Sequence, residues 1–102
     1  MKRIIFTVVI GLLSLQSIPS LAGDAAAGKA KSATCAGCHG PEGISLNDLW
    51  PNLAGQKEGY LIAQIKAFRD GQRSNPMMTP MVAPLSDQDI EDLAAYYSSL
   101  GQ

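Results

Sequence analysis

The sequence has few cysteines, histidines and positive charges. Its 102 residues include two cysteines and one histidine. A structural zinc site takes four ligands, so these residue types cannot complete one. A disulfide between Cys35 and Cys38 would close a very small loop and would stabilise the fold little. A single small domain is expected, and it lacks the cross-links that small domains often need.

Positive charge is scarce after the first three residues. Residues 23–102 contain six Lys and Arg against nine Asp and Glu, a net charge of about −3. This balance argues against nucleic acid and against anionic membrane surfaces as partners.

The N-terminus has the pattern of a secretory signal peptide. Residues 1–3 are Met-Lys-Arg, residues 4–15 are apolar or small, and residues 20–22 are Ser-Leu-Ala. The apolar run has 12 residues, whereas a spanning helix needs ~20. We predict that residues 1–22 are a signal peptide cleaved after Ala22. Residues 23–102 would then form a periplasmic domain without stable membrane insertion.

The apolar pattern predicts three helices and no strand. The expected ranges are 24–35, 57–70 and a last helix that begins at the cap Ser86, with Asp24 as the first N-cap and Gly71 as a stop. Asp89, three residues after Ser86, is close to a capping box. The residues expected to face the core are Leu61, Ile65 and Phe68 in the second helix and Ile90, Leu93, Ala94 and Tyr97 in the third.

Two loop segments join these helices. Residues 40–55 predict an ordered loop that buries apolar side chains, and residues 72–85 contain three prolines, so no regular helix is expected there. The side chains expected to anchor the first loop are Leu46, Leu49, Trp50 and Leu53.

The strongest motif is Cys-Ala-Gly-Cys-His at residues 35–39. C-x-x-C-H is the attachment signature of c-type haem. Cys35 and Cys38 can each add to a vinyl group on one edge of the porphyrin, and His39 then lies under the iron as the proximal ligand. Thiol–disulfide exchange is a weaker alternative because no βαβ unit is predicted, and zinc lacks a fourth ligand.

These residues resemble the class I, Met-ligated cytochromes c of bacteria, and the chain looks most like one half of the dihaem kind. The resemblance implies an all-α, small cytochrome c fold with three main helices and ordered loops around one covalent haem c. This chain departs from the dihaem kind in having one haem motif. The matching segments are residues 23–35, 35–40, 51–56, 60–61, 68–69, 78–87 and 92–100.

The resemblance also implies a sixth iron ligand. In the family this ligand lies seven residues before the Leu that precedes the last cap, which here is Leu85, so the count gives Met78. Met77 and Met81 are the alternatives. Neighbouring side chains in an extended chain point to opposite sides, so at most one of Met77 and Met78 would face the iron.

Further residues receive supporting roles from the resemblance. Pro51 matches the residue whose carbonyl accepts a hydrogen bond from the haem histidine, and Gly28 matches a small residue at a helix crossing, facing Tyr96 or Tyr97. Arg69 and Arg73 are expected to be solvated, with a hydrogen bond to a haem propionate as the alternative for each. The residues expected to form the pocket wall, with ordinary core packing as the alternative, are Trp50, Leu53, Leu61 and Phe68.

Two protein ligands leave the iron no open position, so we predict an electron carrier and not an enzyme. Its partners would be redox protein donors and acceptors, and the protein would be a monomer. Two alternatives stay open. One is a dedicated haem subunit of one enzyme complex. The other is a gas-binding or peroxidase-like haem protein, which requires that no Met bind the iron.

Overall fold

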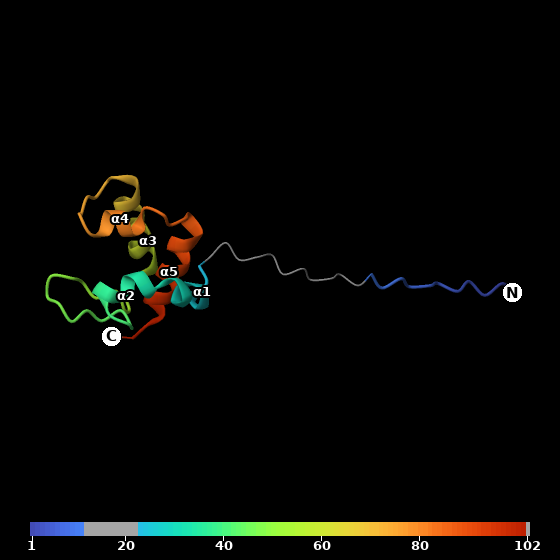
Figure 1. Cartoon of the computed structure of the whole chain (residues 1–102). Helices are drawn as coiled ribbons and strands as arrows, with labels where there is room; N and C mark the ends of the chain where they lie inside the picture. Colours follow the sequence, from blue (N-terminus) through green and yellow to red (C-terminus); the bar gives the residue numbers. More distant parts are fainter. Residues whose placement is uncertain (12–22, 102) are drawn as a thin grey trace.

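The computed structural model describes residues 1–11 and 23–101, so the predicted cleavage site after Ala22 lies outside the described residues. Residues 1–11 lack regular secondary structure. No helix within the described part of the chain is long and apolar enough to cross a membrane. Residues 23–101 form five helices and no strand (Figure 1), which are α1 (Ala25–Lys31), α2 (Ala33–His39), α3 (Glu58–Asp70), α4 (Met78–Val82) and α5 (Asp87–Ser99).

The first predicted helix is divided into α1 and α2 at Ser32. Its predicted N-cap is confirmed, because the Asp24 carboxylate accepts hydrogen bonds from the backbone N–H groups of Ala26 and Ala27. Ser32 is buried, and its hydroxyl donates to the carbonyl oxygen of Lys29 at 2.8 Å. Such a side-chain bond competes with regular helical hydrogen bonding, which accounts for the interruption.

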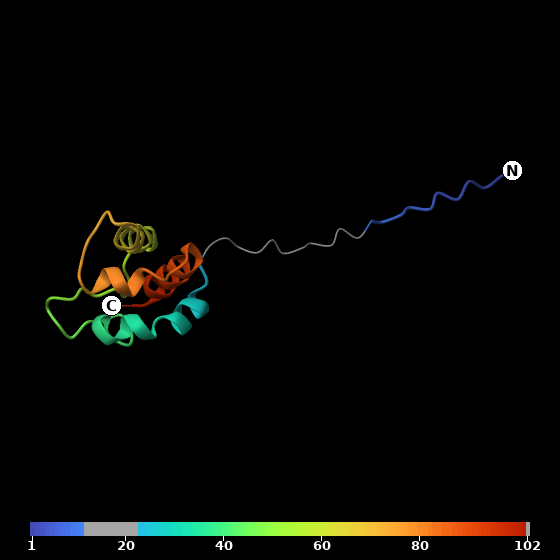
Figure 2. The ribbon, with the colours of Figure 1, turned by 45° about the horizontal axis from the view of Figure 1, so that its top comes forward.

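Helix α5 is the centre of the fold. It packs against α1 on one side and α3 on the other (Figure 2). Its four predicted core residues are all buried, and the predicted capping box between Ser86 and Asp89 is present. Gly71 ends α3 in the left-handed conformation, as predicted. The all-α prediction is therefore confirmed, with helix boundaries set by local caps.

Gly28 lies where α1 crosses α5. A Cβ atom at Gly28 would lie 1.9 Å from the carbonyl oxygen of Asp92 and 2.8 Å from Cβ of Tyr96. The predicted crossing is confirmed, and of the two tyrosines Tyr96 is the one that a side chain at Gly28 would meet. Only glycine allows the two backbones to come this close.

Two predictions for the loops are wrong. Helix α4 lies within residues 72–85, where no regular helix was expected. It is possible because Pro80 sits in the first turn, where backbone N–H groups have no partner inside the helix. In the other loop, Leu46 and Leu49 are 100% and 86% exposed and do not anchor it.

Candidate haem-binding site

A cavity of about 640 Å³ lies among α2, α3, α4, α5 and the loop after α2. In both views of the ribbon, α4 lies across from α2 (Figures 1 and 2). All the predicted site residues line this one cavity, as do Met77 and Met81. The predicted residues are Cys35, Cys38, His39, Trp50, Pro51, Leu53, Leu61, Phe68 and Met78.

His39 is the last residue of α2 and is 7% exposed. Its Nδ1 lies 2.8 Å from the carbonyl oxygen of Pro51. Because a carbonyl can only accept, Nδ1 carries the proton, and Nε2 keeps the lone pair that a metal requires. Gly40 follows with φ of +87°, and a Cβ atom there would lie 1.9 Å from the carbonyl oxygen of Ile44. Glycine at this position allows the chain to turn back toward Pro51.

Cys35 and Cys38 are both free thiols and partly buried. Burial raises the pKa of the Cys35 thiol. A thiol–disulfide catalyst needs the opposite, a lowered pKa that provides thiolate, so the site does not favour that alternative. Within residues 1–11 and 23–101 no group of three or more His, Cys, Asp and Glu is arranged so that it could hold a metal ion.

Helix α4 carries Met78 and Met81, and Met77 is the residue just before it. In the turn that leads into α4, the side-chain oxygen of Asn75 accepts from the N–H groups of Met77 at 2.9 Å and Met78 at 3.0 Å. The chain here is helical, so the expected opposition of neighbouring side chains in an extended segment is wrong. Met77 and Met81 are 47% and 49% exposed, whereas Met78 is only partly exposed. Met78 is therefore the least exposed of the three methionines that line the cavity.

Tyr97 lines the cavity, although the sequence predicted it only as a core residue. It is 2% exposed, and its hydroxyl has no hydrogen-bond partner among the described residues. Buried hydroxyls nearly always find a partner. Burial also raises its pKa, so the hydroxyl stays protonated. The signal that could have placed it was its spacing from Leu93, since residues four apart share one helix face.

Of the two arginines, Arg73 is exposed as expected, whereas Arg69 is partly buried. Arg69 forms ion pairs with Asp70 and Asp87, both at 2.8 Å, and so joins α3 to the start of α5. Arg73 lines the cavity, with its guanidinium carbon 4.2 Å from the centre of the Phe68 ring.

The residues present fit a covalently held haem. One cavity with largely apolar walls is lined by two thiols, three thioethers and an imidazole with a free ring nitrogen. The buried hydroxyl of Tyr97 also lies at this cavity and has no hydrogen-bond partner among the described residues. The fold and this site define a small, all-helical domain for c-type haem.

Comparison with known proteins assigns the family. The family model described as cytochrome c matches residues 25–101, so the chain belongs to the cytochrome c family. It is 57% identical over 81 residues to cytochrome c-554(548) of Halomonas halodenitrificans, covering 76% of this chain and 98% of that protein. It is 48% identical to cytochrome c4 of Pseudomonas aeruginosa, covering 85% of this chain and 43% of that protein.

A solved structure supports the same fold. The crystal structure of reduced recombinant cytochrome c4 from Pseudomonas stutzeri matches with a TM-score of 0.75 and 46% identity, covering 78% of this chain and 47% of that one. The chain thus spans less than half the length of these two cytochromes c4. As a member of this family it is an electron carrier with a covalent c-type haem.

Proposed function

We propose that this chain is a soluble, exported, monomeric one-electron carrier and not an enzyme. In this proposal Cys35 and Cys38 would hold the haem, and His39 and Met78 would bind its iron. The observation that carries the proposal is that a buried histidine on α2 and a partly buried methionine on α4 line one cavity. Its partners would be redox protein donors and acceptors.

Each residue has a definite task in this proposal. The carbonyl oxygen of Pro51 holds the proton on Nδ1 of His39, which directs Nε2 toward the iron. The thioether of Met78 would bind the iron together with His39, which would leave no coordination site for oxygen or peroxide. When bound, the haem supplies one-electron redox chemistry at a potential raised by Met/His ligation and apolar surroundings. Trp50, Leu53, Leu61 and Phe68 provide those surroundings.

The ligand assignment is tested with Met77→Leu, Met78→Leu and Met81→Leu, each made separately in the holoprotein. Leu and Met have similar volumes, so each variant should keep its packing. We expect only Met78→Leu to abolish the far-red absorption band of the oxidised, Met-ligated haem and to lower the reduction potential sharply. Loss of the band in Met77→Leu or Met81→Leu alone would reassign the ligand. Absence of the band in the unmodified protein would favour a gas-binding or peroxidase-like protein.

Export and oligomeric state need separate measurements. The denatured, exported protein should have the mass of residues 23–102 plus one haem, and this haem should not extract into acidic organic solvent. Sedimentation should give a monomer. Recovery only in a stable complex with one enzyme would instead favour the alternative of a dedicated haem subunit.

A further inference from the structure

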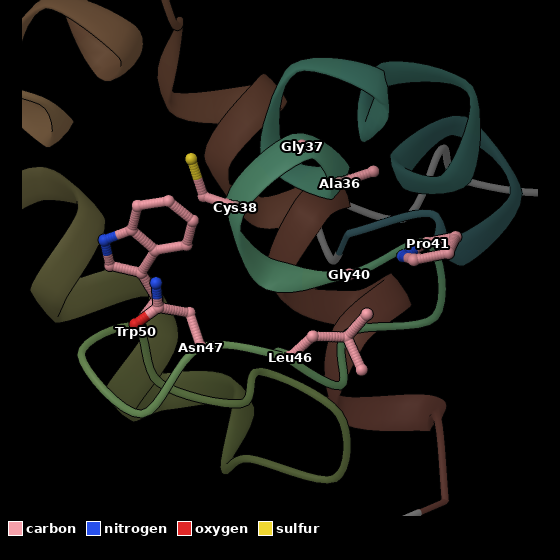
Figure 3. Close-up of a pocket in the computed structure, with 8 residues that line it drawn as sticks. All are labelled: Ala36, Gly37, Cys38, Gly40, Pro41, Leu46, Asn47 and Trp50. Carbon is pink, nitrogen blue, oxygen red and sulfur yellow. The ribbon is translucent and has the colours of Figure 1, made fainter.

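The wall of the haem cavity that contains His39 is bonded to several parts of the fold. In the loop after α2, the N–H of Leu53 donates to the carbonyl oxygen of Gly43 at 2.8 Å, and the N–H of Gly55 donates to that of Tyr97 on α5 at 2.9 Å. Figure 3 shows α2 and the start of this loop in close-up, around a smaller pocket of about 260 Å³. The histidine side of the cavity is therefore held by hydrogen bonds within the loop and to α5.

The opposite wall is formed by residues 74–85, here called the methionine segment, which contains α4 and Met78. Within the described part of the chain, these residues hydrogen-bond only to one another, with one exception. The exception is the carbonyl oxygen of Leu85, which accepts from Nη1 of Arg69 at 3.2 Å. Apolar packing supplies the other contacts, since Val82 is 4% exposed and α4 packs against α3.

Arg69 lies in the last turn of α3, and its guanidinium is fixed in orientation. Its Nε and Nη2 lie 2.8 and 3.1 Å from the two carboxylate oxygens of Asp70, a two-point contact. Its Nη1 lies 2.8 Å from the carboxylate of Asp87, the first residue of α5, in addition to its bond to Leu85. The Arg69 side chain is 19% exposed, so these contacts are partly shielded from solvent.

These contacts connect the two ends of the methionine segment. Arg69 precedes the segment and Leu85 ends it, 16 positions further along the chain. A loop whose ends are held together has fewer open conformations than a free loop. Segments with few bonds to the rest of a fold are the ones that open locally. The bond from Arg69 therefore opposes the opening of the wall that carries Met78.

We propose that Arg69 is a positioning residue, which holds the methionine segment closed and so keeps Met78 at the iron against competing ligands. The proposal rests on Met78 as the sixth ligand and adds a residue that acts through it. Without Arg69 the segment would open more often, although the ligand itself would be unchanged. A competing base would then bind more tightly, because its apparent affinity rises in proportion to the open fraction.

The first test measures how well imidazole competes with Met78 in the oxidised holoprotein. Loss of the far-red absorption band during an imidazole titration gives the dissociation constant. We expect Arg69→Gln to lower this constant about fivefold, the factor that one partly exposed ion pair contributes. Lys66→Gln is the matched control, since it removes the same charge from α3, and Lys66 forms no ion pair within residues 1–11 and 23–101. It should leave the constant unchanged.

Asp87→Asn is a second variant, in which Arg69 and its contact with Asp70 are kept. Asp87 has a side chain that is 67% exposed, so this variant should fold normally. It removes the charged partner beyond the far end of the methionine segment. We expect it to lower the imidazole dissociation constant about twofold, less than Arg69→Gln, because the bond to Leu85 remains.

Amide hydrogen exchange, followed by NMR in the reduced holoprotein, tests the segment without a competing ligand. The N–H groups of Thr79 and Ala83 are bonded inside the segment. In the unmodified protein they should exchange faster than the N–H of Leu93 in α5, which would show that the segment opens on its own. In Arg69→Gln they should exchange about fivefold faster again.

Two outcomes would overturn the proposal. The first is an imidazole dissociation constant that is the same in Arg69→Gln as in Lys66→Gln. The second is unchanged exchange at Thr79 and Ala83 together with a lower overall stability, because Arg69 would then only join α3 to α5. Absence of the far-red band from the unmodified protein would instead count against Met ligation itself, and the exchange rates would still test whether Arg69 holds the segment.

Discussion

Asp92→Asn should lower the free energy of unfolding of the holoprotein by about 2 kcal/mol at pH 7. Asp92 is 3% exposed, and its carboxylate accepts hydrogen bonds from the backbone N–H of Asp24 at 2.8 Å, from Lys31 Nζ at 2.6 Å and from Gln88 Nε2 at 2.9 Å. It therefore fixes the start of α1 to α5 at the crossing that Gly28 makes possible.

The magnitude follows from the pKa of this carboxyl group. The Asp24 N–H, then Lys31 and Gln88, lower the pKa of Asp92 from 3.8 to about 2. Each pKa unit corresponds to about 1.4 kcal/mol, which gives about 2 kcal/mol in total. Because the pKa is lower in the folded state, the stabilisation is complete well above pH 4 and is lost as the pH falls through the folded value. About half of it should remain at pH 3.

The assay is guanidinium denaturation of the oxidised holoprotein, followed by far-ultraviolet circular dichroism at pH 7, 5 and 3. The difference between the unmodified protein and Asp92→Asn should narrow from about 2 to about 1 kcal/mol between pH 7 and pH 3. Glu91→Gln is the matched control, since Glu91 is the adjacent acid on α5 and forms no ion pair within the described part of the chain. A difference that is absent at pH 7, or that is the same at all three pH values, would refute the reasoning.

Two further predictions concern stability. The double variant Cys35→Ala, Cys38→Ala should be largely unfolded by circular dichroism, because a cavity of about 640 Å³ adjoins its small core; a haem-free chain that melts cooperatively would contradict this. Gly28→Ala should lower the free energy of unfolding by about 2 kcal/mol or more, since its Cβ would lie 1.9 Å from the Asp92 carbonyl oxygen. Gly59→Ala is the control, since nothing lies within 4 Å of a Cβ atom at that position. Equal melting temperatures for the two variants would disprove the steric clash at Gly28.

The parts of the fold that the sequence predicted well depend on short-range chemistry. The cap at Asp24, the capping box at Ser86 and the stop at Gly71 each involve a side chain or a glycine acting on backbone within a few residues. The attachment motif is equally local, since its cysteines and histidine lie within five residues. Such features need no knowledge of the rest of the fold.

The wrong predictions came from properties that depend on more distant neighbours. Leu46 and Leu49 were expected to be buried because they are apolar, but burial requires a facing surface, and the loop places them at the margins of two pockets instead. Ser32 divides the first helix because its hydroxyl competes for the carbonyl of Lys29, a choice that propensity alone does not reveal.

Helix α4 shows how a missed local signal affects the functional argument. Asn75 followed by Pro76 is a sequence typical of a helix start, and in the structure these two residues lie just before α4, which begins at Met78. In a helix, residues three and four apart lie on one face, so Met81 shares a face with both Met77 and Met78. Side-chain alternation therefore cannot choose the ligand, and all three methionines line the cavity.

The exposure of the three methionines to solvent offers a better criterion. Asn75 holds the N–H of Met78 at 3.0 Å, and its carbonyl oxygen accepts the next N–H, that of Thr79, also at 3.0 Å. Met78 thus lies in a turn fixed on both sides, and it is less exposed than Met77 or Met81. A ligand that must stay at one distance from the iron in both oxidation states benefits from such fixation. Its lower exposure therefore supports Met78, in preference to Met77 and Met81, as the proposed sixth ligand.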